Sequence, residues 1–469
     1  MTLPRTRTTR ALTTVTAVIG LAALAGCAGN EPGGSSTSAV ASDTVTFWTP
    51  FNTPPRMAVQ QKVAAAFTAK TGIKVNVVGI SAADQNQALV TGAASGKVPD
   101  VMLHAPDQTA AWMGQGLLDA GAAQKVVENL GRQTFSQQAL NLVSSDGKVA
   151  AVPSDGWAHL LVYRKDLFQQ AGLSAPKTID DVADAAGKLK AGKVSGIALG
   201  TQPGTPSATE ALESVLQPAG CQLVQSGKVS IDSPACTHGL ELFKKMADSS
   251  AGGQFDVTSA RGAYLAGNAA MLLFSSHIID EIDGLDPANP PSCSQCGADK
   301  QYLAKNSGFV TVLQSADGKG AQYGSTLNYG IPTGAKTAEA SNFIEYLLSD
   351  GYVENLSSAT EGRVPLRTGT AQEPTKYVDA WSKLPFGADP ANKKSVSDVY
   401  GADTATSVAK GATSISRWAF GTKDAPLEGR VFSQNILSKN LDALLGGAPA
   451  AQVSKQMAQS VTTAQQELG

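Results

Sequence analysis

The chain has 469 residues, of which 42% are hydrophobic and 16% are charged. This length is too great for one hydrophobic core and indicates two globular units, while the apolar content excludes a wholly disordered chain. The formal net charge is −2 and no run of Lys or Arg stands out, which argues against nucleic acid as a partner. The four histidines leave few candidates for a catalytic or metal-binding imidazole.

The N-terminal segment has the pattern of an export signal. Three arginines fall within the first ten residues, residues 11–25 carry no charge, and Leu24-Ala25-Gly26-Cys27 closes the segment. So short an apolar stretch cannot form a permanent transmembrane helix, and residues 1–26 are therefore predicted to be a signal peptide. Leu-Ala-Gly-Cys resembles the bacterial lipobox, in which the cysteine becomes the acylated first residue of the mature protein. The alternative is an ordinary cleavage site beside an unrelated cysteine.

Residues 27–42 are small, polar and rich in Gly and Ser. Such a composition cannot bury apolar surface and predicts a flexible tether. We therefore expect an extracytoplasmic protein that is anchored to the cell membrane by a lipid on Cys27.

Four further cysteines lie in the remaining chain, namely Cys221, Cys236, Cys293 and Cys296. An even number in an exported protein predicts two disulfides, and of the three possible pairings we favour the two local ones, Cys221–Cys236 and Cys293–Cys296. A redox or metal site at the second pair is the alternative. Against it, the pair follows a Pro-rich loop and no second Cys or His pair completes a tetrahedral site, so no metal or other cofactor is predicted.

Short strands and helices alternate along the chain after the tether. Residues 44–48 alternate like a strand, residues 56–71 place apolar side chains on one helix face, and residues 73–78 alternate again, which predicts a βαβ unit. Thr178 is placed to cap a later helix whose first turn carries two aspartates. Further strands are predicted at 100–103, 149–153, 160–163, 269–274 and 323–331, and further helices from 106, at 165–171, at 337–348 and in most of the chain after 396.

Ligands of open α/β sheets bind beyond the carboxyl ends of the strands. This rule nominates three segments, 48–52, 104–107 and the polar elbow expected at 155–157.

Eight or so motifs in a consistent order resemble a known family. In the first third of the chain, these motifs are residues 45–75, which end in Thr-Gly-Ile-Lys-Val, then Lys97-Val-Pro-Asp-Val101, and then Gly116-Leu-Leu118. In the middle of the chain, they are Ala151-Val-Pro153, Tyr163-Arg-Lys-Asp-Leu-Phe168 and Ala171-Gly-Leu173. The later motifs are residues 228–235, residues 267–272 and Gly362-Arg-Val-Pro365. Together they resemble the family 1 extracellular solute-binding proteins of ABC importers, most of which carry sugars.

The resemblance implies an α/β, periplasmic-binding-protein-like fold, with two α/β lobes joined by a hinge and a ligand cleft between them. The first lobe is expected to hold residues 43–154 and 326–361, and the second 155–325 and 362–469. The implied function is the capture of a sugar or oligosaccharide and its delivery to the permease subunits of an ABC transporter. The protein would have no enzymatic activity. It would be a monomer, because closure of the lobes needs no oligomer.

A sugar has apolar ring faces and a rim of hydroxyls, so its site needs aromatic planes with hydrogen-bonding groups beside them. Trp48, Trp157 and Trp418 are candidates for stacking, with core packing as their alternative. Arg363 could bind hydroxyls or an anionic group, or form an ion pair between the lobes. Ser276 and His277 stand where many family members have a Trp-containing segment. The full set of predicted ligand contacts is Trp48, Asn52, Asp107, Asp155, Trp157, Ser276, His277, Asn328, Arg363 and Trp418.

Three other functions stay open at this point. An exported glycoside hydrolase would need a carboxylate pair, which counting cannot exclude, although no Gly-x-Ser-x-Gly or His-Glu-x-x-His motif is present. The same fold could bind a glycerophosphodiester, a polyamine, a metal ion or another polar solute. A surface adhesin or sensor would have the same export signals.

Overall fold

The computed structural model describes residues 44–145, 147–250, 252–315, 320–388 and 391–468. The predicted signal peptide, the tether and Cys27 lie outside these ranges. None of the helices in the described ranges combines the length and apolar character that a membrane span requires.

The chain begins with the predicted βαβ unit. Strand β1 (Thr44–Thr49) pairs in parallel with β2 (Lys74–Gly79), and helix α1 (Pro54–Thr71) connects them. Helix α1 starts with Pro54, whose fixed φ suits a first turn, and ends at Gly72 with a φ of 80°, a conformation that favours glycine. Its Phe67 packs against Phe343 of α13 (Thr337–Leu347) with ring centroids 5.0 Å apart, which joins this unit to a later helix.

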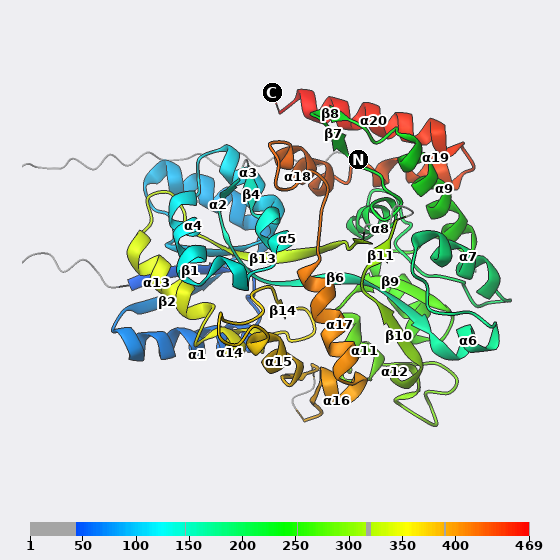
Figure 1. Ribbon diagram of the computed structural model, residues 1–469, viewed down its shortest axis with the longest axis horizontal. Helices are drawn as coiled ribbons and strands as arrows, with labels where there is room; N and C mark the ends of the chain where they lie inside the picture. The colour runs from blue at the N-terminus through cyan, green and yellow to red at the C-terminus, as the bar shows by residue number, and fades with distance from the viewer. Residues whose placement is uncertain (1–43, 146, 251, 316–319, 389–390, 469) are drawn as a thin grey trace, which may run out of the picture. The chain divides into compact units, whose positions relative to one another are not determined.

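The principal sheet has the strand order β10-β6-β13-β3-β1-β2, with β9 and β14 also paired to β6. Strand β3 (Val101–His104) is parallel to β1, whereas β13 (Gly324–Gly330) runs antiparallel to both β3 and β6 (Val152–Arg164). The first part of β6 pairs with β13 and β14 (Val364–Pro365). Its second part pairs with β9 (Met271–Ser275) and β10 (Ser307–Val310), so β6 can be followed in Figure 1 from one group of strands to the other.

The observed strand β6 differs from the sequence prediction for residues 149–163. Residues 149–153 and 160–163 were expected as two strands around a polar elbow, but Val152–Arg164 is one strand of 13 residues and all but two of them are buried. The polar residues fit inside it because Asp155 is bonded to Arg363, which removes the cost of burying the carboxylate alone. The expected elbow is therefore wrong.

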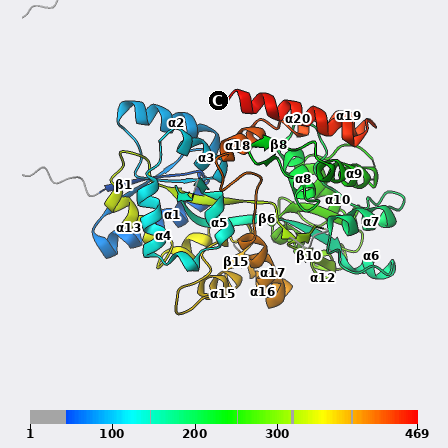
Figure 2. The same ribbon diagram turned by 45° about the horizontal axis from the view of Figure 1, so that its top comes forward.

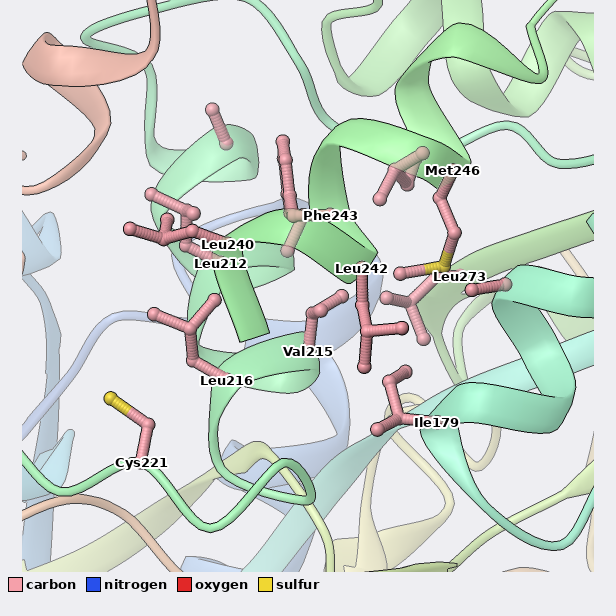
Figure 3. Packing of buried hydrophobic residues seen from close by; sticks show 14 of the residues in the cluster. Ile179, Leu212, Val215, Leu216, Cys221, Leu240, Leu242, Phe243, Met246 and Leu273 are labelled. Carbon is pink, nitrogen blue, oxygen red and sulfur yellow. The ribbon is translucent and has the colours of Figure 1, made fainter. Parts of the chain in front are cut away.

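Three large buried clusters form the core. One packs α7 (Ile179–Leu189), α8 (Pro206–Leu216), α9 (Pro234–Asp248) and β9 together, as Figure 3 shows for Leu212, Phe243 and Met246. Strand β6 serves two of these clusters, because Leu161 faces this one while Leu160 and Val162 face the second. The third cluster lies among β1, β3, α1 and α13.

Other sequence predictions agree with the structure at the level of single elements. The Thr178 hydroxyl accepts a hydrogen bond from the amide of Asp181 at the start of α7, as expected of the predicted cap. Disulfides join Cys221 to Cys236 and Cys293 to Cys296, which confirms the favoured pairing.

The other predicted helical regions are present as α3 (Pro106–Gly114), α6 (Lys165–Gln170), α16 (Val396–Tyr400), α17 (Ala402–Thr413), α18 (Ala425–Ser433), α19 (Leu441–Leu445) and α20 (Ala450–Gln466). The sequence analysis did not predict α2 (Ala82–Ser95), α4 (Ala120–Asn129), α5 (Gln137–Leu142), α10 (Val257–Leu265), α11 (Ile278–Ile282), α12 (Tyr302–Asn306), α14 (Tyr352–Leu356) and α15 (Lys376–Ser382). Helix α18 lies against α3 (Figure 2), so a late segment of the chain contacts an early one.

Candidate functional site

A cavity of about 330 Å³ lies beside the middle of β6 and is lined by residues from β6, β9, α8, α10 and α11. We call it the Trp157 pocket, defined by Trp157, His159, Glu210, Arg261, His277 and Glu281, with smaller side chains between them. Strand β9 and the segment 195–199, which bridge in parallel, both end at the pocket with Ser275 and Gly200. The N-terminal halves of α8 and α10 border it as well. This is the position at which open α/β sheets bind ligands.

Aromatic rings form one wall of the pocket. Trp157 and His159 project from the same face of β6, since side chains two residues apart in a strand point the same way. The Trp157 ring lies 5.8 Å from His159, 6.2 Å from His277 and 6.3 Å from Tyr323, measured between ring centroids. Trp157 and His277 are half-buried, so their rings can contact a bound molecule.

The hydrogen bonds around His159 determine where its protons lie. The hydroxyl of Ser214 donates to the carbonyl oxygen of Glu210 at 2.7 Å, and the same hydroxyl is 3.0 Å from Nδ1 of His159. Because the hydroxyl proton is already donated, Nδ1 must carry the hydrogen of the second bond. The other ring nitrogen, Nε2, is 3.3 Å from the carboxylate Oε2 of Glu210, a contact that is favourable when a proton lies between the two atoms.

A carboxylate with only one hydrogen-bonded oxygen also lines the pocket. Arg261 donates from Nη1 to Oε1 of Glu281 at 3.1 Å, whereas Oε2 of Glu281 is buried and has no hydrogen-bond partner among the described residues. Burial raises the pKa of Glu281 to about 7, against the lowering effect of Arg261. Asp286 and Glu361 add smaller raising contributions through their negative charges.

His277 is held in a tight position between β9 and the chain near Gly362. Its Nδ1 is 2.7 Å from the hydroxyl of Ser275, and a Cβ atom added to Gly362 would lie 1.8 Å from its Nε2. Any side chain at position 362 would therefore displace the ring. Burial lowers the pKa of His277, so the imidazole is neutral at neutral pH.

A second and larger cavity, of about 920 Å³, lies between α2, α3 and α18. Asp107, Gln108 and Arg430 line it, and no aromatic side chain is among its described lining residues. Burial raises the pKa of Asp107, while the charge of Arg417 acts against this rise. The absence of ring planes from its walls makes it the weaker candidate for a sugar.

The predicted ligand contacts separate into two groups in the structure. Trp157 and His277 line the pocket, whereas Ser276 is fully buried beside it and its hydroxyl donates to the carbonyl oxygen of Glu361 at 3.0 Å. Asp107 lines the second cavity instead.

Asp155 and Arg363 bind each other rather than facing a cavity. Arg363 donates from Nε and Nη2 to the two carboxylate oxygens of Asp155 at 2.9 and 2.6 Å. Its remaining amino group bonds Asn355 and Ser358, and Asp155 and Arg363 are 0% and 1% exposed. Arg363 thus forms an ion pair, as in the alternative considered for it, but with a residue of the same expected lobe.

The other predicted contacts lie away from both cavities. Trp418 is 3% exposed and donates from Nε1 to the carbonyl oxygen of Cys221, inside the first core cluster. Trp48 packs against a small cluster that contains Trp112. Asn328 is buried and donates to the carbonyl oxygen of His104, and Asn52 is exposed.

Sequence reasoning missed His159, Glu210, Asp256, Arg261 and Glu281, which line the pocket. A signal existed only for His159, which follows Trp157 by two positions and would share its face in a continuous strand. The other four come from helices or loops that the sequence places far from Trp157. Within the described ranges, no group of three or more His, Cys, Asp or Glu is arranged to hold a metal ion.

The fold and the pocket together define a ligand-binding α/β protein whose site lies at the carboxyl ends of strands. More specifically, the chain belongs to the family of bacterial extracellular solute-binding proteins, whose model matches residues 62–386. This membership confirms the family class that the motifs indicated, and it places the protein among non-enzymatic solute binders outside the cytoplasm. The hydrolase alternative therefore loses its support.

Two relatives have similar sequences. YcjN of Escherichia coli, named as an ABC transporter periplasmic-binding protein, is 27% identical over 300 residues, which is 62% of this chain and 65% of that protein. The lactose-binding protein of Rhizobium radiobacter is 33% identical over 143 residues, covering 29% of this chain and 32% of that one. The matches thus span less than two thirds of the length of either relative.

Solved structures share the fold at lower identity. The GacH receptor of Streptomyces glaucescens, solved unliganded and with acarbose, is 18% identical with a TM-score of 0.64 over 90% of this chain and 98% of that one. The cyclic α-maltosyl-1,6-maltose binding protein of Arthrobacter globiformis is 16% identical with a TM-score of 0.66 at the same coverage. These similarities confirm the predicted fold class.

Proposed function

We propose that this protein binds a sugar or a short oligosaccharide and delivers it to the permease of an ABC importer. The observation that carries the proposal is the Trp157 pocket, where aromatic and imidazole rings line one cavity together with the hydrogen-bonding side chains of Glu210, Arg261 and Glu281. The relatives that bind lactose, acarbose and a cyclic maltosaccharide support the same class of solute.

The pocket has the groups that sugar recognition requires. A pyranose presents an apolar face that can stack on Trp157, and its hydroxyls can donate to carboxylates and accept from a guanidinium. The cavity volume of about 330 Å³ lies at the lower end of the range for small-molecule sites, about 300–1,000 Å³, which favours a small saccharide.

The proposal includes the two lobes and the anchor expected from the sequence. Residues 43–154 and 326–361 would form one lobe and the remainder the other, with β6 and β13 crossing between them. Closure of the lobes would exclude water from the pocket and strengthen its polar contacts. A lipid on Cys27 would hold a monomer at the outer face of the cell membrane. The glycerophosphodiester alternative loses its main residue, because the guanidinium of Arg363 is committed to Asp155.

Thermal unfolding of the purified protein with a panel of mono- and oligosaccharides and polyols tests the proposal. A solute that binds only the folded state adds about 2.7 kcal/mol of stability at a hundredfold excess over its dissociation constant. Calorimetry should then show that Trp157→Ala weakens binding about tenfold or more, because the stacking plane is lost. Trp48→Ala is the matched control and should retain the affinity. If no member of the panel stabilises the protein, the proposed function is wrong.

A further inference from the structure

The charged side chains that line the Trp157 pocket are mostly acidic. Glu210, Asp256 and Glu281 line it together with one cation, Arg261. Asp280 precedes Glu281 on α11, and burial together with the neighbouring carboxylates raises the pKa of Asp280 to about 8. Among the described residues, three carboxylates and one guanidinium therefore line the pocket.

The two histidines of the pocket do not supply the missing charge. His159 Nε2 lies 3.3 Å from Oε2 of Glu210, so a positive charge on this ring would be balanced by the Glu210 carboxylate. His277 is neutral because burial lowers its pKa. Arg261 bonds only one oxygen of Glu281, and Asp256 caps α10 at the rim of the pocket.

Glu281 is the one pocket carboxylate with a buried oxygen and no partner among the described residues. Its side chain is 9% exposed, and Oε2 receives no hydrogen bond. A buried carboxylate oxygen without a donor is costly, so a native structure keeps one where a ligand completes it. A sugar hydroxyl or an ammonium group could donate to this oxygen, and the bond from an ammonium group is the stronger one because its donor is charged.

We propose that the solute carries a protonated nitrogen, as an amino sugar does, and that its ammonium group binds Oε2 of Glu281 while its ring lies on Trp157. This inference rests on the proposed function and names the substrate class of the same pocket. The neighbouring rings favour the same chemistry, because an ammonium group is attracted to the face of an indole. A Trp plane with an adjacent acid thus selects a basic saccharide over its neutral analogue.

Matched ligands that differ by one charge test the inference. Glucosamine is compared with N-acetylglucosamine and glucose, and β-1,4-linked glucosamine oligomers with their N-acetylated forms, by calorimetry at pH 7. The amine of each set should bind at least about tenfold more tightly than its neutral partners, as expected for a charge-assisted hydrogen bond in a buried site.

Two variants test whether Glu281 is responsible for the preference for the amine. Glu281→Gln should lose the preference for the amine, so that the amine and the neutral sugar bind with similar affinity, and circular dichroism checks that the variant is folded. Glu354→Gln removes the same charge from an exposed pair with Lys62 and should keep the preference. Neutral sugars binding as tightly as the amines would overturn the inference and leave the proposed function standing. A preference that survives in Glu281→Gln would overturn the role of Glu281. If no saccharide of either kind binds, the proposed function itself fails.

Discussion

Replacing Asp155 with Asn removes the negative charge opposite Arg363 with almost no change in side-chain volume. The two groups share a pair of parallel hydrogen bonds of 2.9 and 2.6 Å, and Asp155 and Arg363 are 0% and 1% exposed. The hydroxyl of Ser154 donates to the same carboxylate at 2.6 Å. Because Asn355 and Ser358 hold the other end of the guanidinium, Arg363 cannot turn toward water to recover its solvation.

The variant therefore leaves a buried guanidinium without a counter-charge. Breaking a buried pair by removing one partner costs about 3–5 kcal/mol, which is a large part of the 5–15 kcal/mol that stabilises a typical protein. Replacing both residues, as in Asp155→Asn with Arg363→Met, removes the isolated charge as well. The double variant should thus be less destabilised than the sum of the two single variants.

Equilibrium unfolding in guanidinium chloride, followed by tryptophan fluorescence, measures these differences as shifts of the midpoint. Glu354→Gln, which breaks the exposed pair with Lys62, is the control and should change the free energy of unfolding by about 1 kcal/mol at most. The reasoning is refuted if Asp155→Asn costs less than the control while the affinity for the sugar falls. That result would return Asp155 to the role of ligand contact.

Three further predictions concern pH, the disulfides and close packing. Burial raises the pKa of Asp280 to about 8 and of Glu281 to about 7, so between about pH 4 and pH 8 the folded state binds more protons than the unfolded state. The free energy of unfolding should fall as pH rises through this window, and Asp280→Asn with Glu281→Gln should flatten the profile measured by chemical unfolding. Replacing the Cys221–Cys236 disulfide by two alanines should lower the free energy of unfolding by about 3 kcal/mol for its 15-residue separation, and a much smaller loss would contradict the loop-entropy argument. Gly362→Ala should weaken sugar binding in calorimetry by displacing the imidazole beside it, and unchanged affinity would show that the ring does not shape the pocket.

Local patterns in the sequence were sufficient for much of the fold. The βαβ unit at 44–79 followed from alternation and helical spacing, because each of its elements buries a face that its own residues define. The Thr178 cap and the two disulfides were likewise set by neighbours close in the chain. Family motifs spread over the chain indicated the fold class, but not the strand order of the sheet.

Predictions failed where a residue's role depends on a distant partner. Trp418 was assigned to the ligand because it is aromatic and lies in a loop, yet it packs in the core beside Cys221, nearly 200 positions away along the chain. The polar run at 154–157 was expected as an elbow because its compensating residue, Arg363, lies 208 positions after Asp155. Sequence separation of this size hides the charge pairing that lets a polar segment join a sheet.

The same property distinguishes the two carboxylates that matter most for this protein. Asp155 is buried, and every hydrogen-bonding position it offers toward Arg363 is used, so a ligand has nothing to add there and the residue stabilises the crossing strand. Glu281 is also buried and lines the Trp157 pocket, but only one of its carboxylate oxygens has a donor, Arg261, among the described residues. Burial by itself does not distinguish structure from function in these residues. What distinguishes them is whether a carboxylate oxygen still lacks a hydrogen-bond donor. In the Trp157 pocket, we propose that the bound solute supplies that donor.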